Sequence, residues 1–558
     1  MRGSIGSMLL DRLRLSGVSR IYGVPGDYNL EFLALIERTP GITFIGTCNE
    51  LNAAYAADGD ARLTGIGAVL VTYGVGDLSA LSAVAGACAE GVPLVVISGM
   101  PPWHAIESRA LVHHTLADGN YDNVMACYQQ FTVATARLHP ASAVAETDRV
   151  LHAVQAFRRP VYIQFPSDIC YVDVEVGSSP VAAGLSDPAL VDRAASCIAQ
   201  RIRQARQAVV LVDAMVRQYG LAERVQQLCM QYGIPYAVLS SARTIMPEEG
   251  QEWLGAYGGA ASAPHVADYV HGADCVIGLG VRFVDSTSGY FSQQIGVGAL
   301  VDIQPFSLTC DGENFQGITA ASLLDAVLHK LAAQPHKRAD LPPPAVKTAP
   351  PPAPQAWEQA VFWPKAEAFL QPGDVVVADN GSSMTAMLHA RLPARCSLLV
   401  QPIWAAIGYS LPASLGACLA TPHRRHVLFI GDGSFQMTAQ ELSTLLRHRC
   451  NITIFLINNG GYTIERMILG PKAAYNDIAN WDYASLPMAL GPDAAPLSLR
   501  AGSVAELDAA LAQAARHEGV VFVEVGFTPM DAPPAMAAMG AAVRRYDYGI
   551  ETPDLKDA

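Results

Sequence analysis

The chain has 558 residues, 51% of them hydrophobic, and a formal net charge of −14. This length predicts two to four domains with large cores, and the apolar content excludes disorder as the dominant state. The acidic balance, with basic residues that form no clusters, argues against a nucleic-acid-binding protein.

The first residues predict an amphipathic helix rather than a signal peptide, because Arg2, Asp11, Arg12 and Arg14 surround only a few apolar residues. An uncharged stretch at 401–422 is long enough to span a membrane, but prolines and glycines interrupt it. We therefore expect a buried loop and helix there, and no membrane partner. The eleven cysteines contain no Cys-x-x-Cys pair, which favours reduced thiols and a cytoplasmic protein.

Short apolar runs alternate with helical patterns along the chain, which is typical of α/β domains with parallel sheets. The predicted buried strands cover 67–72, 93–98, 160–165, 208–212, 276–279, 375–378, 427–430, 452–457 and 520–525. Segments 173–188, rich in Gly, Ser and Pro, and 335–354, rich in Pro, separate these strands into three groups. The pattern predicts three units, at 1–180, 181–345 and 346–558.

Two early motifs carry polar side chains, Gly-Val-Pro-Gly-Asp-Tyr-Asn at 23–29 and Asn-Glu-Leu-Asn-Ala at 49–53. By itself Asp27 suits a turn, and Glu50 suits the first turn of a helix. His113 and His114 are adjacent, so in a regular strand they would face opposite ways. A loop pair on the surface is the plainer interpretation, and acid–base chemistry is the functional one.

A fourth motif follows a strand at 426–430, which runs into Gly431-Asp432-Gly433-Ser434. The next strand ends in Asn458-Asn459-Gly460-Gly461. A carboxylate and an amide are hard oxygen donors suited to Mg²⁺, and glycines let backbone amides approach phosphate oxygens. Gly-Asp-Gly alone is a common turn, but the two half-motifs together predict a metal–diphosphate clamp.

These motifs resemble the thiamine diphosphate signature, and the whole chain is similar to the 2-oxo acid decarboxylases of the pyruvate, indolepyruvate and branched-chain type. The resemblance includes Gly461-Tyr462-Thr463-Ile464-Glu465. It implies three doubly wound parallel-sheet domains, of which the first binds the aminopyrimidine of the cofactor, the second is structural and the last binds the diphosphate and Mg²⁺. It also implies a homodimer as the smallest active unit, paired into a homotetramer.

The resemblance assigns roles to individual positions. Glu50 would bond the aminopyrimidine ring and promote its imino tautomer, while the histidines and the other acids serve the substrate carboxylate and the proton step. The catalytic set is Asp27, Glu50, His113, His114 and Glu465. The cofactor contacts are Thr72, Asn380, Ser382, Ala405, Ile407, Gly431, Asp432, Gly433, Ser434, Asn459, Gly461 and Tyr462, and the metal ligands are Asp432, Asn459 and Gly461.

One segment departs from the family, because Trp404-Ala405-Ala406-Ile407-Gly408 stands where Trp-Gly-Ser-Ile-Gly is usual. Ile407 keeps the stiff side chain that would wedge between the two cofactor rings. Ala405 still offers its carbonyl to the aminopyrimidine, but its methyl group narrows the approach. We expect reduced activity, or a preference for substrates of a different shape.

Substrate choice is expected to depend on pocket positions matched from relatives, namely Ser286, Met384, Thr385, Ile464, Ile468, Met539 and Val543. Met384 is flexible and favours a substrate larger than pyruvate, whereas Ile464 narrows the pocket. Segments 284–289 and 470–478 resemble the branched-chain and indolepyruvate enzymes. The expected reaction is non-oxidative decarboxylation to an aldehyde and CO₂, with a broad range that includes branched-chain or aromatic 2-oxo acids.

Three alternatives stay open from the sequence. One is a strict pyruvate decarboxylase, and another is a carboligating enzyme that forms 2-hydroxyketones, which leaves the histidine pair unexplained. The third is a protein that binds the cofactor without turnover, suggested by Ala405 and Ala406. A nicotinamide enzyme is discounted, because no Gly-x-Gly-x-x-Gly opens a strand-to-helix turn.

Overall fold

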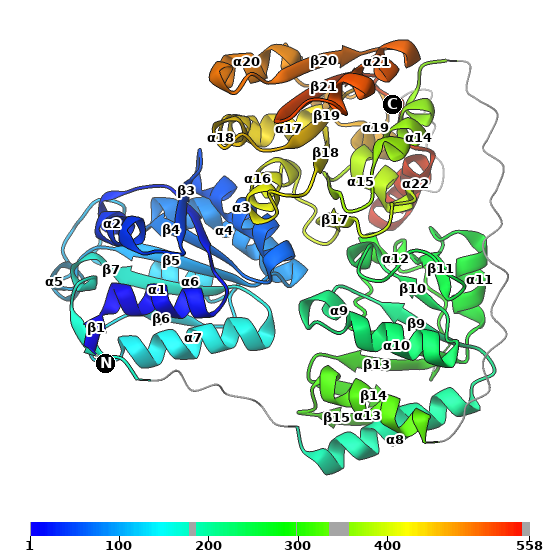
Figure 1. The fold of residues 1–558 in the computed structure, drawn as a ribbon, viewed down its shortest axis with the longest axis horizontal. Helices are drawn as coiled ribbons and strands as arrows, with labels where there is room; N and C mark the ends of the chain where they lie inside the picture. The colour runs from blue at the N-terminus through cyan, green and yellow to red at the C-terminus, as the bar shows by residue number, and fades with distance from the viewer. Residues whose placement is uncertain (1, 178–185, 297, 334–355, 550–558) are drawn as a thin grey trace.

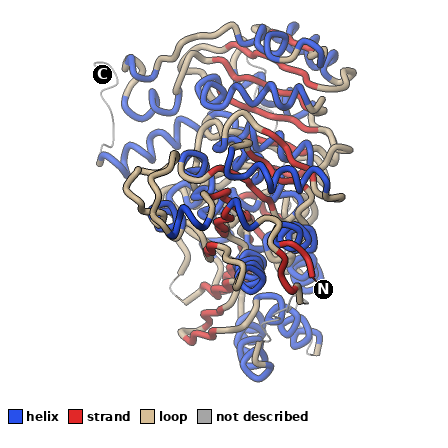
Figure 2. The backbone as a smooth tube through the Cα atoms, turned by 90° about the vertical axis from the view of Figure 1, so that its left-hand side faces the viewer, coloured by secondary structure: helices blue, strands red, loops and turns tan. Residues whose placement is uncertain are grey.

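The computed structural model describes residues 2–177, 186–296, 298–333 and 356–549. Three large sheets follow one another along the chain (Figure 1), and helices enclose their strands (Figure 2). The predicted boundaries at 180/181 and 345/346 lie outside the described residues and stay predictions.

The first sheet has six strands in the order β3-β2-β4-β5-β7-β6, and every pair is parallel. Its strands are β2 (Arg20–Gly23), β3 (Thr43–Gly46), β4 (Gly67–Thr72), β5 (Leu94–Met100), β6 (Thr135–Arg137) and β7 (Val161–Pro166). Its helices are α1 (Ile5–Leu15), η1 (Asp27–Asn29), α2 (Leu30–Arg38), α3 (Glu50–Thr64), α4 (Val75–Glu90), α5 (Trp103–Glu107), α6 (Asn123–Tyr128), α7 (Ala143–Phe157) and η2 (Ser167–Ile169). A separate pair, β1 (Arg2–Ser4) and β8 (Asp173–Glu175), is antiparallel. The predicted N-terminal helix is confirmed as α1.

The central sheet has seven strands in the order β11-β10-β9-β12-β13-β14-β15, of which the last two run antiparallel to their neighbours. They are β9 (Ala208–Val212), β10 (Tyr236–Val238), β11 (Trp253–Ala256), β12 (Cys275–Leu279), β13 (Leu300–Gln304), β14 (Ser307–Cys310) and β15 (Glu313–Gln316). The helices are α8 (Pro188–Gln204), α9 (Met215–Gln218), α10 (Ala222–Tyr232), η3 (Ser240–Ala242), α11 (Pro264–Gly272), α12 (Asp285–Ser288) and α13 (Ala320–Ala332).

A disulfide joins Cys197 on α8 to Cys310 on β14. The prediction of reduced thiols is therefore wrong for this pair. The sequence gives no signal for the bridge, because 113 residues separate the two cysteines. The other nine cysteines are free, and most of them are buried as small apolar groups.

The third sheet has six parallel strands in the order β17-β16-β18-β19-β21-β20. They are β16 (Val375–Ala378), β17 (Ser397–Leu399), β18 (His426–Gly431), β19 (Ile452–Asn458), β20 (Leu497–Ala501) and β21 (Val520–Gly526). The helices are α14 (Gln359–Phe369), α15 (Ser382–His389), α16 (Ser410–Ala420), α17 (Asp432–Thr438), η4 (Ala439–Glu441), α18 (Leu442–Arg447), α19 (Thr463–Leu469), η5 (Ala474–Asn476), η6 (Tyr483–Ser485), α20 (Leu486–Leu490), η7 (Pro492–Ala494), α21 (Val504–Ala514) and α22 (Pro534–Tyr548).

The uncharged stretch at 401–422 forms a loop followed by α16, as predicted. Within the described part of the chain, no helix is long and apolar enough to cross a membrane. The cytoplasmic location stays a prediction.

The first and third domains share one hydrophobic core, in which α3 lies against α16 (Figure 1). Two glycines make this contact close. A Cβ atom at Gly59 would overlap the carbonyl oxygen of Ala413, and one at Gly416 would overlap that of Ala56. The two helices therefore touch backbone to backbone.

Candidate active site

The motifs singled out in the sequence follow the carboxyl ends of strands, which in parallel sheets is the edge where ligands bind. Asp27 follows β2, and His113 and His114 lie in the loop that follows α5. His113 Nε2 lies 2.8 Å from Asp27 Oδ2, and the His113 ring stacks on Tyr28 at 4.9 Å between centroids. The first domain thus brings Asp27 and the histidine pair together.

The backbone explains how two adjacent histidines reach one place. His114 has a φ of +62°, in the left-handed region, so the chain turns between the two residues and their ring centroids lie 4.5 Å apart. The carbonyl of His114 sits where a Cβ of Gly74 would be. The opposite facing expected for a regular strand does not apply here, because the segment is a loop.

Glu50 begins α3, and Asn49 caps this helix by accepting a hydrogen bond from the Asn52 N–H at 2.8 Å. Glu50 Oε1 lies 3.2 Å from the place of a Cβ on Gly76, so the carboxylate rests against the first turn of α4. A residue larger than glycine at position 76 would therefore displace the Glu50 side chain.

Thr72 ends β4 and is 5% exposed. The amide of Asn29 donates to its Oγ1 at 3.3 Å, and a Cβ on Gly26 would overlap the same oxygen. Thr72 is therefore packed directly on the turn that carries Asp27.

The predicted clamp is assembled around Asp432, which is 1% exposed. Its Oδ1 accepts from the Gly433 N–H at 2.8 Å, and its Oδ2 accepts from the N–H groups of Asn459, Gly460 and Gly461 at 3.2, 2.7 and 3.1 Å. Burial raises the pKa of Asp432, and these four donors oppose that increase. The two half-motifs predicted from the sequence are thus in direct contact.

The donor chemistry of the clamp fits a hard cation. Asn459 Nδ2 donates to Thr463 Oγ1 at 2.6 Å, which leaves its Oδ1 available as an acceptor. The Asp432 carboxylate, that amide oxygen and the Gly461 carbonyl form an all-oxygen set, the kind that Mg²⁺ prefers. Glycine is required in the clamp, since a Cβ at Gly433 would lie 2.5 Å from the Tyr462 ring.

Ala405 follows β17 on a loop and has a φ of +54°. Asn380 Nδ2 donates to the Ala405 carbonyl oxygen at 3.0 Å, so two predicted cofactor contacts meet. That carbonyl can still accept a second hydrogen bond. Ile407 lies half-buried two residues later.

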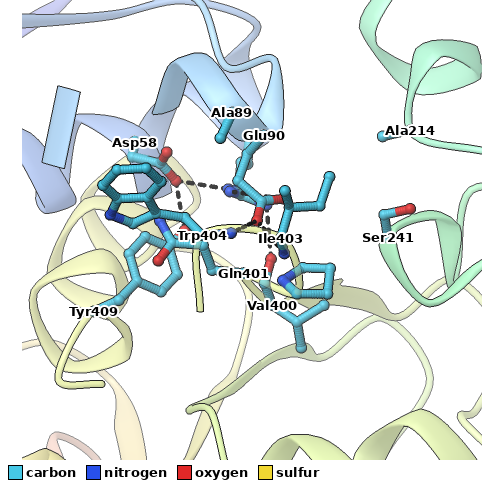
Figure 3. Close-up of polar contacts among 12 residues, drawn as sticks. Asp58, Ala89, Glu90, Ala214, Ser241, Val400, Gln401, Ile403, Trp404 and Tyr409 are labelled. Atoms are coloured by element: carbon cyan, nitrogen blue, oxygen red, sulfur yellow. Dashed lines mark hydrogen bonds and ion pairs between the residues drawn. The ribbon is translucent and has the colours of Figure 1, made fainter. Parts of the chain in front are cut away.

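Side chains of the other two domains hold this loop, and Figure 3 shows the contact made by the first domain. The Glu90 side chain on α4 accepts from the N–H groups of Ile403 and Trp404 at 2.8 and 3.1 Å. From the central domain, Ser286 donates to the Pro402 carbonyl at 2.7 Å. Ser286 was predicted to line the substrate pocket, and in this chain its hydroxyl is used to fix the loop.

Asp379, 1% exposed at the end of β16, anchors the far side of the loop. It accepts from the Gly408 N–H at 3.3 Å and from the Ser410 N–H and hydroxyl at 3.1 and 2.5 Å. Burial raises its pKa, and hydrogen bonds from Ser410 and Ser434 oppose this. Asp379 thereby ties the Ile407 loop to the Gly431–Ser434 turn.

Apart from Ser286 on α12, the predicted pocket residues lie on α15, α19 and α22, and α22 packs on both of the other two helices. Ile468 and Val543 are nearly buried, Ile464 and Met539 are half-buried, and Glu465 is exposed. Met384 and Thr385 on α15 are buried, and Ser382 donates to Met536 at 3.5 Å. The guanidinium of Arg544 on α22 donates to the Ile468 and Met467 carbonyls and joins α22 to the end of α19.

The site residues fall into two groups on one chain. Among the described residues, no hydrogen bond, ion pair or ring contact joins Asp27, Glu50, His113 or His114 to Glu465 or the clamp. Figure 1 places α15, α19 and α22 on the side of the third domain that faces α12, away from the first sheet.

Three supporting residues were missed in the sequence, namely Glu90, Asp379 and Glu441. Each is a buried carboxylate that accepts backbone or side-chain donors from distant segments. No local motif marks such a residue, because its partners are defined only by the fold. An acid next to an otherwise apolar strand or helix end was the only available signal.

Family models match all three domains. They are the thiamine pyrophosphate enzyme N-terminal TPP binding domain over 4–122, the central domain over 195–310 and the C-terminal TPP binding domain over 379–525.

The chain is also similar to proteins named alpha-keto-acid decarboxylase. It is 39% identical to that of Mycolicibacterium paratuberculosis over 538 residues, covering 95% of both chains. It is 39% identical to that of Mycobacterium leprae over 545 residues, 96% of this chain and 95% of the relative. It is likewise 39% identical to that of Mycobacterium tuberculosis over 539 residues, 95% of both. The chain therefore belongs to the thiamine diphosphate-dependent alpha-keto-acid decarboxylases and is a carboxy-lyase with the fold of the thiamine diphosphate enzymes.

Proposed function

We propose that the protein converts a 2-oxo acid to an aldehyde and CO₂ with thiamine diphosphate and Mg²⁺. The observation that carries this proposal is the cluster of Asp27, His113 and His114. Three proton-exchanging groups in one place can deliver a proton to the carbon that has lost CO₂, and that protonation yields an aldehyde. The carboligating alternative leaves the adjacent histidine pair unexplained.

Thiamine diphosphate, when bound, supplies the electron sink that makes loss of CO₂ possible. Glu50 holds and moves the proton at the aminopyrimidine ring nitrogen. The Ala405 carbonyl would accept from the amino group with the lone pair that Asn380 leaves free. Ile407, whose side chain is stiff at χ1, would pack against the two rings of the cofactor.

The diphosphate end is held by the clamp. Asp432, Asn459 Oδ1 and the Gly461 carbonyl would ligate Mg²⁺, while Gly433 and Ser434 at the start of α17 would border the phosphate oxygens. Gly431 and Tyr462 border this position, and the Tyr462 ring packs on Gly433. Removing divalent ions is expected to release the cofactor.

We further propose a broad substrate range that includes branched-chain or aromatic 2-oxo acids. The supporting observation is the aliphatic wall of Ile468, Met539 and Val543, in which methionine adapts to different shapes. Burial raises the pKa of Tyr290 in the central domain to about 12, and the nearby carboxylates of Asp285, Asp547 and, least of the three, Glu465 add to this increase. Glu465 is exposed and would face the substrate carboxylate at the solvent side of this aliphatic wall.

A panel of 2-oxo acids tests the reaction and its range together. The protein is loaded with cofactor and Mg²⁺, and aldehyde formation from pyruvate, 2-oxoisovalerate, phenylpyruvate and indolepyruvate is coupled to an alcohol dehydrogenase. Faster turnover of the larger acids is expected. Pyruvate as the only substrate would contradict the broad range, and hydroxyketone products would favour the carboligating alternative. Bound cofactor without any aldehyde would contradict the proposal itself.

The two separate groups of site residues support a homodimer, paired into a tetramer, as the working form. Asp27, Glu50 and the histidines of one protomer would meet the clamp and Glu465 of the partner subunit. Exposed apolar side chains on α4 and near the clamp, including Val75, Leu78 and Met437, offer surface for a second copy.

Mixed dimers test this arrangement. Glu50→Gln and Glu465→Gln are each expected to be inactive, but co-expression restores about a quarter of the wild-type activity. About half of the dimers are then mixed, and each mixed dimer has one intact site. The matched control pairs Glu50→Gln with Asp27→Asn, which share one group and leave every site with one defect. Recovery in neither pair would contradict a site shared between subunits.

A further inference from the structure

The turn that carries Glu50 rests on the third domain of the same chain. The Cys48 thiol donates to the Gln440 carbonyl at 3.2 Å, and the Arg447 guanidinium donates to the Gly46 carbonyl. The supporting surface is η4 with the start of α18. Residues some 390 positions away in sequence therefore hold the loop from which Glu50 projects.

Glu441 is at the centre of this contact and is fully buried, at 0% exposure. Its Oε2 accepts from the Cys48 N–H at 3.2 Å and from Asn52 Nδ2 at 2.8 Å. These two donors lie on either side of Glu50 in sequence. One carboxylate oxygen thus fixes both flanks of the residue that serves the aminopyrimidine.

Joining two domains through a buried carboxylate costs folding free energy. Taking a charge out of water carries a large desolvation penalty, and an apolar contact of similar volume often serves stability as well or better. Glu441 also leaves Oε1 buried without a hydrogen-bond partner among the described residues. What the carboxylate supplies, and an apolar residue does not, is a directional acceptor for both donors.

We propose that Glu441 is a positioning residue for Glu50. It holds the turn so that the Glu50 carboxylate stays against the first turn of α4 at Gly76, where it would meet the aminopyrimidine. The inference rests on the proposed role of Glu50. Since misplacement of a catalytic group by about 1 Å can cost about 100-fold in rate, loss of this anchor is expected to slow proton removal from the cofactor.

The test compares wild type with Glu441→Ala, Glu441→Gln and Asp374→Asn as full-length proteins. Asp374 is a matched control, because it is also a buried carboxylate of the third domain and pairs with Arg425 at 2.6 Å, at the start of β16. Two readouts need no substrate. They are the amide hydrogen exchange of residues 48–52 in the cofactor-free protein and the deuterium exchange of the C2 proton of the bound cofactor.

In Glu441→Ala we expect faster amide exchange at 48–52 and C2 exchange slowed by about 10- to 100-fold with cofactor bound. Glu441→Gln keeps an acceptor oxygen and is expected to recover most of the loss. Asp374→Asn lowers the thermal midpoint and leaves both exchanges unchanged. If Glu441→Ala does not fold, Asn52→Ala removes one donor from the opposite side, with the same expected direction.

C2 exchange within about twofold of wild type in the loaded Glu441→Ala protein would overturn the inference. Equal slowing in Asp374→Asn would also overturn it, because the effect would then be general destabilisation. A protein that makes no aldehyde from any 2-oxo acid, but shows C2 exchange that depends on Glu441, would contradict the proposed reaction and leave the inference intact.

Discussion

At the residue scale, Ala405 stands in a backbone conformation that favours glycine. Its φ of +54° lies in the left-handed region, where a Cβ costs roughly 1–2 kcal/mol. From the sequence alone, this departure from the family predicts only that the Ala405 methyl group narrows the space around the Ala405 carbonyl. The structure adds that the loop, held by Glu90 and Asp379, imposes the conformation on alanine.

Ala405→Gly is therefore expected to be better tolerated than the same change one residue later. Glycine relieves the left-handed strain at 405, which offsets its own loss of about 0.5–1 kcal/mol in chain entropy. Ala406 is not in the left-handed region, so Ala406→Gly has only the entropic cost. Thermal midpoints of the two variants measure the difference, and an Ala406→Gly protein at least as stable as Ala405→Gly would contradict the strain.

Asp77 offers a pH-dependent test at the same scale. It is fully buried on α4, accepts from Ser98 and the Gly74 N–H at 2.8 and 3.0 Å, and burial raises its pKa to about 7. Between about pH 4 and 7 the folded protein keeps a proton that the unfolded chain releases, so this group lowers stability as pH rises.

Asp77→Asn removes that titration. Relative to wild type, its thermal midpoint is expected to gain more at pH 8 than at pH 5, with a difference of about 2–3 kcal/mol in the free energy gained at the two pH values. The same variant measured at the two pH values is its own control for packing changes. A gain that does not change with pH would mean that Asp77 is ionised in the folded protein throughout.

At the scale of elements, the nine strands expected from apolar runs are all present, within about two residues at either end. Short strands such as β3 and β6 went unseen because three or four partly exposed residues give no periodic signal. The antiparallel β14–β15 hairpin of the central domain was missed for the same reason.

The same limit applies to the site, where only residues with a local sequence signal could be predicted. Clamp residues such as Asp432 and Asn459 could be predicted because their chemistry is local to strand ends. The meeting of Asp27 with His113 required the family resemblance, since 86 positions separate them. Glu90 and Glu441 lay beyond sequence reasoning, because a buried acid acquires its role from a fold that places distant N–H groups around it.

The contact between α19 and α22 gives a prediction for an element. Arg544 is 6% exposed and donates to the carbonyls that end α19, where a cation also suits the helix dipole. Arg544→Ala is expected to lower the thermal midpoint by roughly 2–8 °C and to raise KM for the 2-oxo acid.

Arg545→Ala is the matched control, since this neighbour on α22 is exposed. Thermal scans and substrate saturation curves of the two variants distinguish a specific anchor from a general effect of charge. Identical behaviour of both variants would show that α22 does not depend on Arg544.

At the scale of the whole molecule, the Cys197–Cys310 disulfide closes a segment of 113 residues in the central domain. A bridge over that length stabilises a fold by about 4–5 kcal/mol in the chain-entropy model. A thiol reductant is therefore expected to lower the unfolding temperature of the central domain. Cys197→Ser should start from the lower value and show no further change with reductant.

Cys127→Ser is the control, because Cys127 is free and exposed in the first domain, and this variant should respond to reductant as wild type does. Thiol titration of the unreduced, denatured chain should find nine thiols. Eleven thiols would mean that the bridge is absent from the protein as purified.

The glycine contacts between α3 and α16 decide where the protein can bend. Gly59 and Gly416 bring one helix backbone onto the other, so no side chain separates the two helices at these two points. We therefore expect the first and third domains to move together rather than to hinge at this contact. We therefore expect substrate entry and product exit to depend on the motion of a smaller element. The candidate is α22, which carries the predicted pocket residues Met539 and Val543. It is joined to α19 by Arg544 and is exposed on its outer side.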